Sequence, residues 1–394
     1  MKTLKKKLIE YSNSNLLHSN FSQLQLVRHA DNIIGYDRWI EITDIINKRA
    51  DSLSNHEKID LVAPIYQSLK SYEEAATLQC SQGSMVLESF NLILEYLYQT
   101  KPKKILELGC YTGIYANYIA QEFPDSDVIG VDMEDNLIEF GQGRFNGKNL
   151  NLIKSSYHNF SRTSNSKHDF IFSMCGYGSI DTDINCDHHN IRSDHDYKEN
   201  YKHWSNFFGD IDLLSYEKCD LVMHIRLNSL RELLFIFDAA QSNNYTPNLN
   251  KLVKFNFNEF DVNDEGGNNK INKTGYILFF DRNISKKISL SDFFKYSLEK
   301  NILINDPLRI FYKYEIMIKD PHESRVDQDY DNGRKNNIHL GSIDNSFYVF
   351  LWDNYCNAVY EEFTSTDEAL RFIKDRTGVD LIPSKVSSNN QKSE

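Results

Sequence analysis

The amino-acid sequence predicts an α/β fold with a mainly parallel sheet. Helical segments separate five short apolar runs of strand type, which span 104–108, 127–132, 150–155, 168–174 and 219–227. A crossover helix between successive strands makes neighbouring strands parallel. Two further strand-type runs, 252–262 and 274–282, are separated only by a polar stretch. They predict an antiparallel hairpin at one edge of the sheet.

Helical periodicity accounts for most of the chain before and between these strands. Apolar residues recur at three- and four-residue spacing before the first strand, in 38–53, 58–78 and 84–100, and after it, in 114–123, 135–145 and 228–243. Residues 1–80 are therefore expected to form a helical cap. The core that follows is expected to pass from strand to helix and back.

The pattern changes after residue 286. Strand-type segments at 306–320, 337–344 and 346–363 precede a helical segment, which has Ser365 as its N-cap and Gly378 as its C-terminal stop. These features predict a small α+β domain. The expected organisation is a cap over 1–80, an α/β core over 81–286, the α+β domain over 287–385 and a disordered tail over 386–394.

Composition and charge restrict the classes of function. The 394-residue chain carries a formal net charge of −12, so its surface as a whole lacks the basic field that binds nucleic-acid phosphates. No apolar run is long enough for a signal peptide or a membrane span. The six cysteines form no CxxC pair, which favours reduced thiols and a cytoplasmic protein.

The turn after the first strand, Glu-Leu-Gly-Cys-Tyr-Thr-Gly at 107–113, is the most informative segment. Ligands of parallel sheets bind at the carboxyl ends of the strands. Gly109 and Gly113 lack a Cβ, so the backbone can approach a ligand, and Glu107 can accept a hydrogen bond. The second strand ends at Asp132. An acid at this position can accept hydrogen bonds from both hydroxyl groups of a ribose. The ligand is therefore expected to be a nucleoside.

An acid two residues before the first glycine, with a second acid closing the next strand, resembles the class I S-adenosylmethionine-dependent methyltransferases. The resemblance extends over about residues 80–283 and includes the terminal hairpin. It implies a Rossmann-like seven-stranded methyltransferase sheet and an enzyme with S-adenosyl-L-methionine as cofactor. The stretch "ELGCYTGIYA" is most similar to the turn of catechol- and caffeoyl-coenzyme-A-type O-methyltransferases, where a bulky residue also replaces the middle glycine.

The resemblance implies a set of cofactor-binding residues, namely Glu107, Gly109, Tyr111, Gly113, Asp132, Met133, Ser156, Tyr157 and Met174. Glu107 would lie near the amino group of the cofactor, Asp132 would hold the ribose hydroxyls, and Met133 would lie against the adenine. Residues 156–157 would lie near the adenine edge. Met174, which closes the fourth strand, would face the sulfonium and the substrate.

The magnesium ligands of the catechol-type enzymes are missing. Those enzymes use an aspartate closing the fourth strand and an Asp-Asn pair after the fifth, whereas this chain has "FIFSMCGYG" and "LVMHIRLNS" there. We therefore expect no magnesium mechanism and assign no metal ligand. The stretch 186–196 is rich in Asp and His but matches no strong zinc spacing. A metal site joined by His224, a substrate-facing loop and a solvated loop all stay open.

The long segment 175–211 follows the fourth strand, and the resemblance places it beside the reactive methyl group. The expected catalytic residues are Tyr177, His188 and His189, which would act as a base or orient the acceptor. Aromatic residues of the cap are further candidates for lining an acceptor pocket, namely Tyr36, Trp39 and Tyr66.

Together these features predict methyl transfer to a small metabolite, such as a natural-product intermediate or an amino or keto acid. Two alternatives stay open. The chain could methylate a peptide or protein side chain, with the C-terminal domain as a docking module, or it could bind the cofactor without catalysis. Besides the small-molecule substrate, a peptide or carrier protein and a second copy of the chain are candidate partners. Nucleic acid and membrane are not expected partners.

Overall fold

The computed structural model describes most of the chain in twelve stretches, which are 2–19, 21–54, 62–81, 84–174, 194–225, 234–260, 270–282, 324–329, 335–343, 346–353, 358–378 and residue 380. The chain divides into two compact units. The first comprises 1–186, 202–227 and 237–286, and the second comprises 187–201, 228–236 and 287–394. The expected catalytic residues Tyr177, His188 and His189 lie outside the described residues, as do the strand expected at 306–320 and the expected tail.

The first unit contains a sheet whose strands run in the order β3-β2-β1-β4-β5-β8-β6, with β7 paired to β8. Its strands are β1 (Lys104–Leu108), β2 (Asp127–Asp132), β3 (Leu150–Lys154), β4 (His168–Met174), β5 (Ser215–Ile225), β6 (Tyr245–Pro247), β7 (Val253–Phe260) and β8 (Lys270–Arg282). The pairs among β1 to β5 are parallel, and β8 is antiparallel to β5, β6 and β7. The predicted parallel sheet and edge hairpin are confirmed.

The sheet has eight strands rather than the seven expected, because the short strand β6 pairs with the end of β8. Its Tyr245 is fully buried, and the hydroxyl groups of Tyr245 and Ser215 are 2.7 Å apart. This contact joins the start of β5 to the far edge of the sheet.

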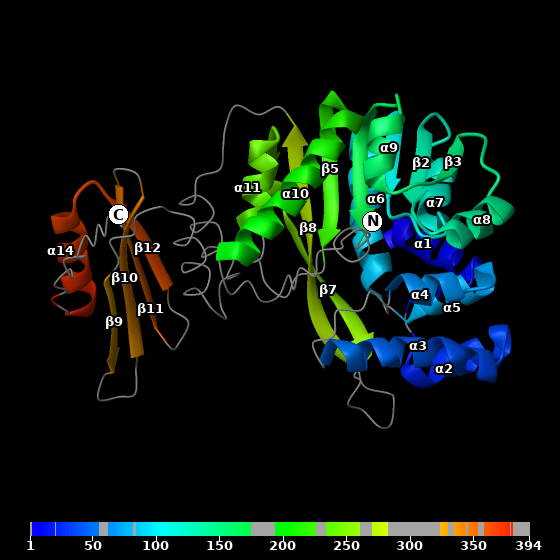
Figure 1. Cartoon of the computed structure of the whole chain (residues 1–394), viewed down its shortest axis with the longest axis horizontal. Helices are drawn as coiled ribbons and strands as arrows, with labels where there is room; N and C mark the ends of the chain where they lie inside the picture. Colours follow the sequence, from blue (N-terminus) through cyan, green and yellow to red (C-terminus); the bar gives the residue numbers. More distant parts are fainter. Residues whose placement is uncertain are drawn as a thin grey trace, which may run out of the picture. The chain divides into compact units, whose positions relative to one another are not determined.

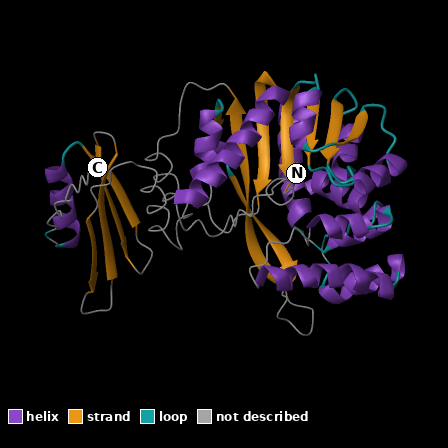
Figure 2. Ribbon diagram, viewed as in Figure 1, coloured by secondary structure: helices purple, strands orange, loops and turns teal. Residues whose placement is uncertain are grey.

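Helices cover both faces of the sheet (Figure 2). They are α6 (Met85–Thr100), α7 (Ile114–Glu122), α8 (Asp135–Arg144), α9 (Tyr157–Thr163), α10 (Asp194–Leu214) and α11 (Leu234–Ser242). Successive residues of β8 show the two faces, because neighbouring side chains of a strand point in opposite directions. Phe279 contacts Tyr96 of α6, with ring centroids 5.0 Å apart, while Phe280 contacts Phe208 of α10 at 5.2 Å.

Helix α10 forms the second half of the segment 175–211. From Asp194 onward the segment is helical, so the last residues of the stretch 186–196 begin a helix and not a loop. Trp204 and Phe207 of this helix are buried, and their rings lie 5.6 Å apart. His203 is buried as well. The face of the helix that carries His203, Trp204 and Phe207 therefore packs into the core of the first unit.

The cap consists of five helices that precede α6, namely α1 (Lys2–Ser14), α2 (Gln23–Ile34), α3 (Tyr36–Ser54), α4 (Val62–Ser68) and α5 (Tyr72–Cys80). Figure 1 shows them beside the edge of the sheet where the parallel strands end. Apolar residues of α1 and α2, such as Leu8 and Leu26, share one buried cluster with α6 and α7. The cap is therefore packed onto the core of the first unit.

The helix expected over 58–78 is divided at residues 69–71 into α4 and α5. Arg38 of α3 fixes this break. Its guanidinium donates from Nε and Nη2 to the two carboxylate oxygens of Glu74, at 2.9 and 2.8 Å, and from Nη2 to the carbonyl oxygen of Ser68 at 2.5 Å. The backbone N–H of Lys70 also donates to Glu74, at 2.8 Å. A bidentate pair of this kind has a fixed geometry, so it sets the angle between the two helices.

The second unit contains an antiparallel sheet of order β12-β11-β10-β9. Its strands are β9 (Ser324–Asp329), β10 (Lys335–Ile343), β11 (Ser346–Asp353) and β12 (Ala358–Phe363). Helix α14 (Thr366–Thr377) buries Ala369 and Ile373 against this sheet. Ser365 accepts a hydrogen bond from the backbone of Glu368, and Gly378 has φ 74°. The predicted N-cap and C-terminal stop are confirmed.

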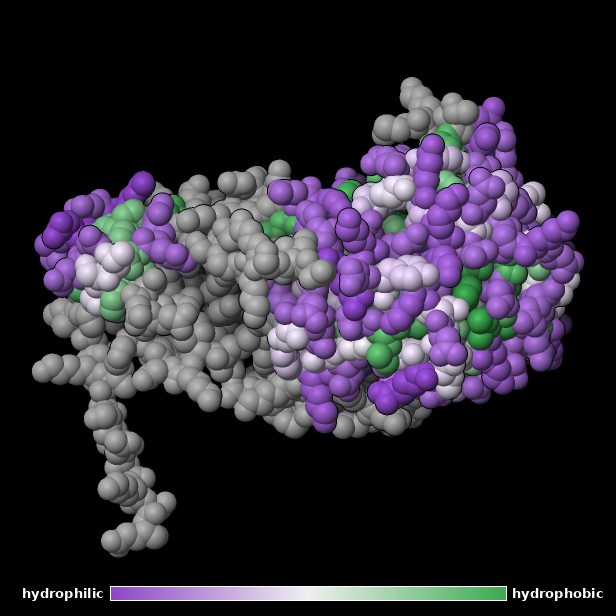
Figure 3. Space-filling model, turned by 90° about the horizontal axis from the view of Figure 1, so that it is seen from above, coloured by the Kyte–Doolittle hydropathy of each residue, from purple (hydrophilic) through white to green (hydrophobic). Residues whose placement is uncertain are grey.

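Hydrophilic side chains dominate the described surface in the view of Figure 3, and hydrophobic ones occur there in small groups. None of the helices that the structure describes has the length and hydropathy needed to cross a membrane.

Candidate functional site

The candidate site lies where the strand order reverses. Strand β1 has β2 on one side and β4 on the other, and the chain continues outward in both directions from this pair. In an open parallel sheet, a crevice forms outside the carboxyl ends of the strands at such a point. Strand β1 ends there at Leu108, and β4 ends at Met174. The turn 109–113 directly follows β1 and therefore lies at the edge of the sheet where such a crevice is expected.

The backbone of the turn occupies the left-handed region three times. Gly109 has φ 70°, Tyr111 has φ 56° and Gly113 has φ 73°. The N–H groups of Gly109 and Cys110 both donate to the carbonyl oxygen of Val131, at 2.8 and 3.0 Å. For the non-glycine Tyr111 this conformation costs roughly 1–2 kcal/mol. Surrounding contacts must therefore hold Tyr111 in place.

Two glycines allow close packing around the turn, namely Gly113 within it and Gly141 in α8. A Cβ on Gly113 would lie 2.4 Å from Cδ2 of Leu152 in β3, and a Cβ on Gly141 of α8 would lie 2.1 Å from the backbone oxygen of Thr112. Gly113 is therefore required for packing as well as for its backbone conformation. The sequence interpretation missed Gly141, since a close approach between a helix and a distant turn leaves no local signal.

Glu107 is a buried acid near the carboxyl end of β1. Its side chain is 1% exposed, and its Oε2 has no hydrogen-bond partner in the described part of the chain. Burial raises the pKa of Glu107 well above its usual range, and the nearby charge of Asp132 raises it further, against the opposing effect of the Ala116 backbone N–H. A buried, unpartnered carboxyl oxygen is costly. It marks a position where a ligand donor would be favourable.

Asp132 stands at the end of β2, next to the turn. Its Oδ2 accepts a hydrogen bond from the backbone N–H of Tyr111 at 2.7 Å, and its Oδ1 accepts one from the N–H of Glu134 at 3.1 Å. Burial raises the pKa of Asp132 to about 6, although these backbone donors lower it. Each carboxylate oxygen can accept a second hydrogen bond. Asp132 can therefore hold the turn and still accept bonds from a ligand.

The remaining expected cofactor residues lie around Asp132 and the end of β4. Met133 is 37% exposed, an unusual position for a large apolar side chain next to a buried acid. The N–H of Ser155 donates to the carbonyl oxygen of Asp132 at 2.9 Å, which brings the start of α9 to the same edge. Ser156 is the N-cap of α9, and the ring of Tyr157 contacts Phe207 at 5.6 Å. Met174 is buried at the end of β4.

The aromatic cap residues do not gather in one pocket. Tyr36 is 53% exposed, while Trp39 is buried in the main core. Tyr66 packs in a separate cluster together with Tyr111 of the turn. This arrangement does not support a joint aromatic acceptor site.

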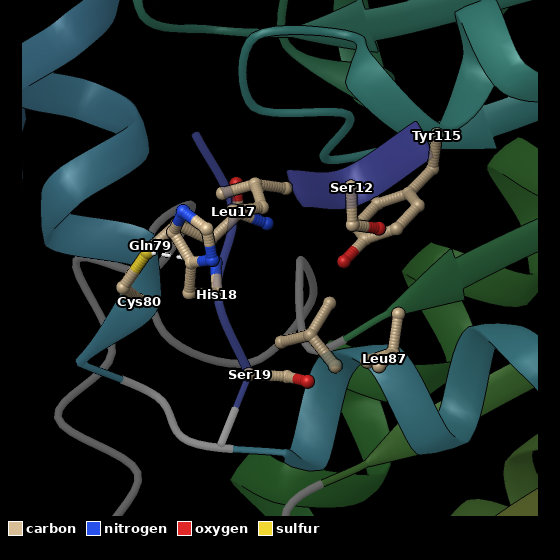
Figure 4. A pocket seen from close by; sticks show the side chains of 9 residues that line it. Ser12, Leu17, His18, Ser19, Gln79, Cys80, Leu87 and Tyr115 are labelled. Atoms are coloured by element: carbon tan, nitrogen blue, oxygen red, sulfur yellow. Dashed lines mark hydrogen bonds between the residues drawn. The ribbon is translucent and has the colours of Figure 1, made fainter. Parts of the chain in front are cut away.

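A small hollow lies between the cap and the start of α7 (Figure 4). Ser12, His18 and Gln79 of the cap line it together with Cys80, Leu87 and Tyr115. Its volume of about 20 Å³ is room for about one water molecule. Ser12 Oγ and Gln79 Oε1 lack hydrogen-bond partners among the described residues. The hollow fits a bridging water better than a cofactor or a substrate.

Across the described ranges, no group of three or more His, Cys, Asp or Glu side chains is placed to hold a metal ion. His224 is buried, and its ring contacts Phe255 at 5.2 Å. The Asp- and His-rich residues 186–193 lie outside the described part.

Comparison with known proteins identifies the domain. Residues 105–185 match the family model of the methyltransferase domain. The chain is 32% identical over 80 residues to a malonyl-[acyl-carrier protein] O-methyltransferase of Bacillus cereus, a stretch covering 20% of this chain and 29% of the relative. It is 31% identical over 90 residues to malonyl-[acyl-carrier protein] O-methyltransferase 1 of Ilyobacter polytropus, covering 23% and 33%. The matched stretch thus spans a third or less of the length of these relatives.

Solved structures of methyltransferases are also similar. Precorrin-6y C5,15-methyltransferase from Geobacter metallireducens has 11% identity and a TM-score of 0.35, covering 50% of this chain and 89% of that chain. TrmN from Thermus thermophilus has 11% identity and a TM-score of 0.33, covering 49% and 48%. The Rossmann-like fold is assigned from the strand order of the sheet. The first unit is thus a Rossmann-like α/β unit. More specifically, it contains a methyltransferase domain, which includes the candidate turn.

Proposed function

We propose that this chain transfers a methyl group from S-adenosylmethionine to a small metabolite. The observation that carries the proposal is the buried carboxyl group of Glu107, whose Oε2 has no partner in the described structure, beside Asp132 at the reversal point of the sheet. The match of 105–185 to the methyltransferase domain supports the same reading of this crevice.

The residues present fit the cofactor. Glu107 would accept a hydrogen bond from its amino group, which resolves the unpartnered oxygen. Asp132 would accept bonds from the ribose hydroxyls through its remaining lone pairs, and the exposed Met133 would cover the adenine. When bound, the cofactor supplies an activated methyl group on a sulfonium. The protein's task in such a displacement is to position the acceptor and to exclude water.

The relatives are named as O-methyltransferases of a malonyl group on acyl-carrier protein, so they favour a small acyl group over a peptide side chain as the acceptor. We keep a small metabolite, free or attached to a carrier protein, as the acceptor. Tyr177, His188 and His189 remain the proposed residues that orient the acceptor or remove its proton. The changes Tyr177→Phe, or His188→Ala with His189→Ala, should lower turnover while cofactor affinity stays within about threefold.

An acceptor screen tests the proposal. The purified chain is incubated with S-adenosylmethionine and either the small-molecule or the protein fraction of a cell extract, and formation of S-adenosylhomocysteine is measured. We expect product with the small-molecule fraction. Product with the protein fraction alone would favour a peptide or protein side chain if hydroxylamine, which cleaves thioesters, does not release the methylated group, and an acyl group on a carrier protein if it does. No product with either fraction, despite cofactor binding, would favour a binding scaffold.

A further inference from the structure

We propose that Tyr111 and Asn136 couple docking of the cap segment 62–80 to cofactor binding. The inference rests on the proposed function and concerns the same crevice. Tyr111 belongs to the turn on one side of Asp132, and Asn136 lies on the other side, near the start of α8. Side chains of both residues are bonded to the cap segment rather than directed at the crevice. Both are therefore positioning residues that act through the turn and the end of β2.

The first link runs through Tyr111. Its hydroxyl donates to the carbonyl oxygen of Ala75 in α5 at 3.1 Å, and its ring meets that of Tyr66 in α4 edge-to-face at 5.5 Å. Its backbone N–H is at the same time bonded to Asp132 at 2.7 Å. One residue thus joins the candidate ribose acid to both short cap helices. Tyr111 has a left-handed backbone conformation, with φ 56°. The hydrogen bond of its N–H to Asp132 and that of its hydroxyl to Ala75 hold this conformation.

The second link runs through Asn136, four positions after Asp132. Its Nδ2 donates to the carbonyl oxygens of Tyr66 and Leu69, at 2.7 and 3.0 Å. These carbonyls lie in the last turn of α4 and just after it, where a helix leaves acceptors without intrahelical partners; the Tyr66 carbonyl also accepts from the N–H of Leu69 at 3.1 Å. Asn136 therefore closes the end of α4. Leu69, Ala75 and Leu137 share a buried cluster around the two links.

These two links make the coupling reciprocal. If the docked cap stabilises the backbone of 109–113 and 132–136 in the geometry that binds the cofactor, then bound cofactor must stabilise the docked cap by the same factor. Undocking of 62–80 would free the turn to leave its left-handed conformation, and Asp132 would lose the neighbour that fixes its Oδ2. The cap is then part of the cofactor site, although it supplies no direct ligand contact in this proposal.

The test compares two tyrosine variants. Tyr111→Phe removes only the hydroxyl that reaches α5 from the turn. Tyr72→Phe is the matched control, because the Tyr72 hydroxyl also serves α5 but donates to the carbonyl oxygen of Asn15 at 3.1 Å, within the cap. S-adenosylhomocysteine is the probe. For each protein, calorimetry measures the affinity for the probe. Hydrogen exchange of residues 62–80 is then measured with and without the probe.

In wild type and in Tyr72→Phe, the probe should slow exchange in 62–80. In Tyr111→Phe the affinity should fall roughly 3- to 10-fold, as expected for one hydrogen bond, and the probe should slow exchange in 62–80 much less. Asn136→Ala should act in the same direction. Equal affinity and equal protection in Tyr111→Phe and wild type would overturn the coupling, as would equal losses in both tyrosine variants. If wild type does not bind the probe at all, the proposed function fails and the inference falls with it.

Discussion

The backbone N–H of Tyr111 donates to Oδ2 of Asp132 at 2.7 Å, which joins the glycine turn to the acid that closes the next strand. The two parts of the sequence signature are therefore one hydrogen-bonded unit. Asp132 holds the turn in place through this hydrogen bond. Asp132 is itself buried, and burial raises its pKa. A change at either residue is expected to affect both the geometry and the ligand affinity of the crevice.

Gly113 should be intolerant of any side chain. In Gly113→Ala the new Cβ would lie 2.4 Å from Leu152 at a φ of 73°, so we expect a loss of roughly 2–4 kcal/mol in unfolding free energy. Adding Leu152→Ala should relieve the clash but not the backbone cost. Gly143→Ala is the control, because nothing lies within 4 Å of its Cβ position and helix propensity favours alanine. Denaturant unfolding measures all four proteins, and a Gly113→Ala variant as stable as wild type would refute the packing role.

The ion pair between Arg38 and Glu74 should hold the cap together. Arg38→Ala leaves Glu74, which is 7% exposed, without its bidentate partner. The Arg38 side chain is 17% exposed, so the loss of unfolding free energy should be smaller than the roughly 3–5 kcal/mol of a fully buried pair. Lys6→Ala provides the control, because the Lys6–Glu10 pair is solvent-exposed and should contribute less than about 1 kcal/mol. Proteolysis within 62–80 should accelerate in Arg38→Ala only; equal rates in both variants would show that the pair does not secure the cap.

The raised pKa of Asp132 should make the free energy of unfolding depend on pH. Because the folded-state pKa is about 6 and the ordinary value is 3.8, the folded protein binds this proton more tightly than the unfolded chain. Its contribution to the unfolding free energy is thus greatest below about pH 4 and is lost as pH rises to about 6. The loss should be roughly 3 kcal/mol. Unfolding free energies measured from pH 4 to 7 should show this fall in wild type but not in Asp132→Asn; parallel curves would contradict it.

Cofactor binding should release a proton from Glu107. Burial raises the pKa of Glu107 well above its usual range, so the free protein holds this proton more tightly than an ordinary glutamate does. Pairing with the cationic amino group of the ligand favours the ionised form. Calorimetry of S-adenosylhomocysteine in two buffers of different ionisation enthalpy should therefore give different apparent heats. Glu107→Gln should remove the difference, and identical heats for wild type would place the amino group elsewhere.

Local patterns in the sequence were sufficient for most of the sheet. The runs that became β1, β2 and β4 are mainly apolar and end at polar or glycine-containing turns, so their limits could be predicted. Strand β6 has only three residues, too few for a pattern. The start of β5 contains the exposed residues Tyr216, Glu217 and Lys218, which mask its strand character. Buried Trp204 and Phe207 in α10 follow a polar stretch, and the sequence did not identify the helix that contains them.

The candidate site divides in the same way. The spacing of Glu107, Gly109, Gly113 and Asp132 is local, so the sequence alone could predict that the turn and Asp132 lie at the same edge of the sheet, where Tyr111 and Asp132 are hydrogen-bonded. The role of the Tyr111 side chain depends on Ala75, which lies 36 positions away. Gly141 matters only because α8 passes close to the turn. Contacts of this kind arise from tertiary packing and leave no pattern in a single sequence.

The most direct test of the central claim is a calorimetric titration of the full chain with S-adenosylhomocysteine. Asp132→Ala is compared with Asp135→Ala, a matched acid three positions further whose carboxylate pairs with Lys154 and is 58% exposed. Wild type and Asp135→Ala should bind alike, Asp132→Ala should bind roughly 10- to 100-fold more weakly because it loses charge-assisted hydrogen bonds to the ribose, and NAD⁺ should not bind. Unchanged affinity in Asp132→Ala, or absence of binding to wild type, would contradict the account.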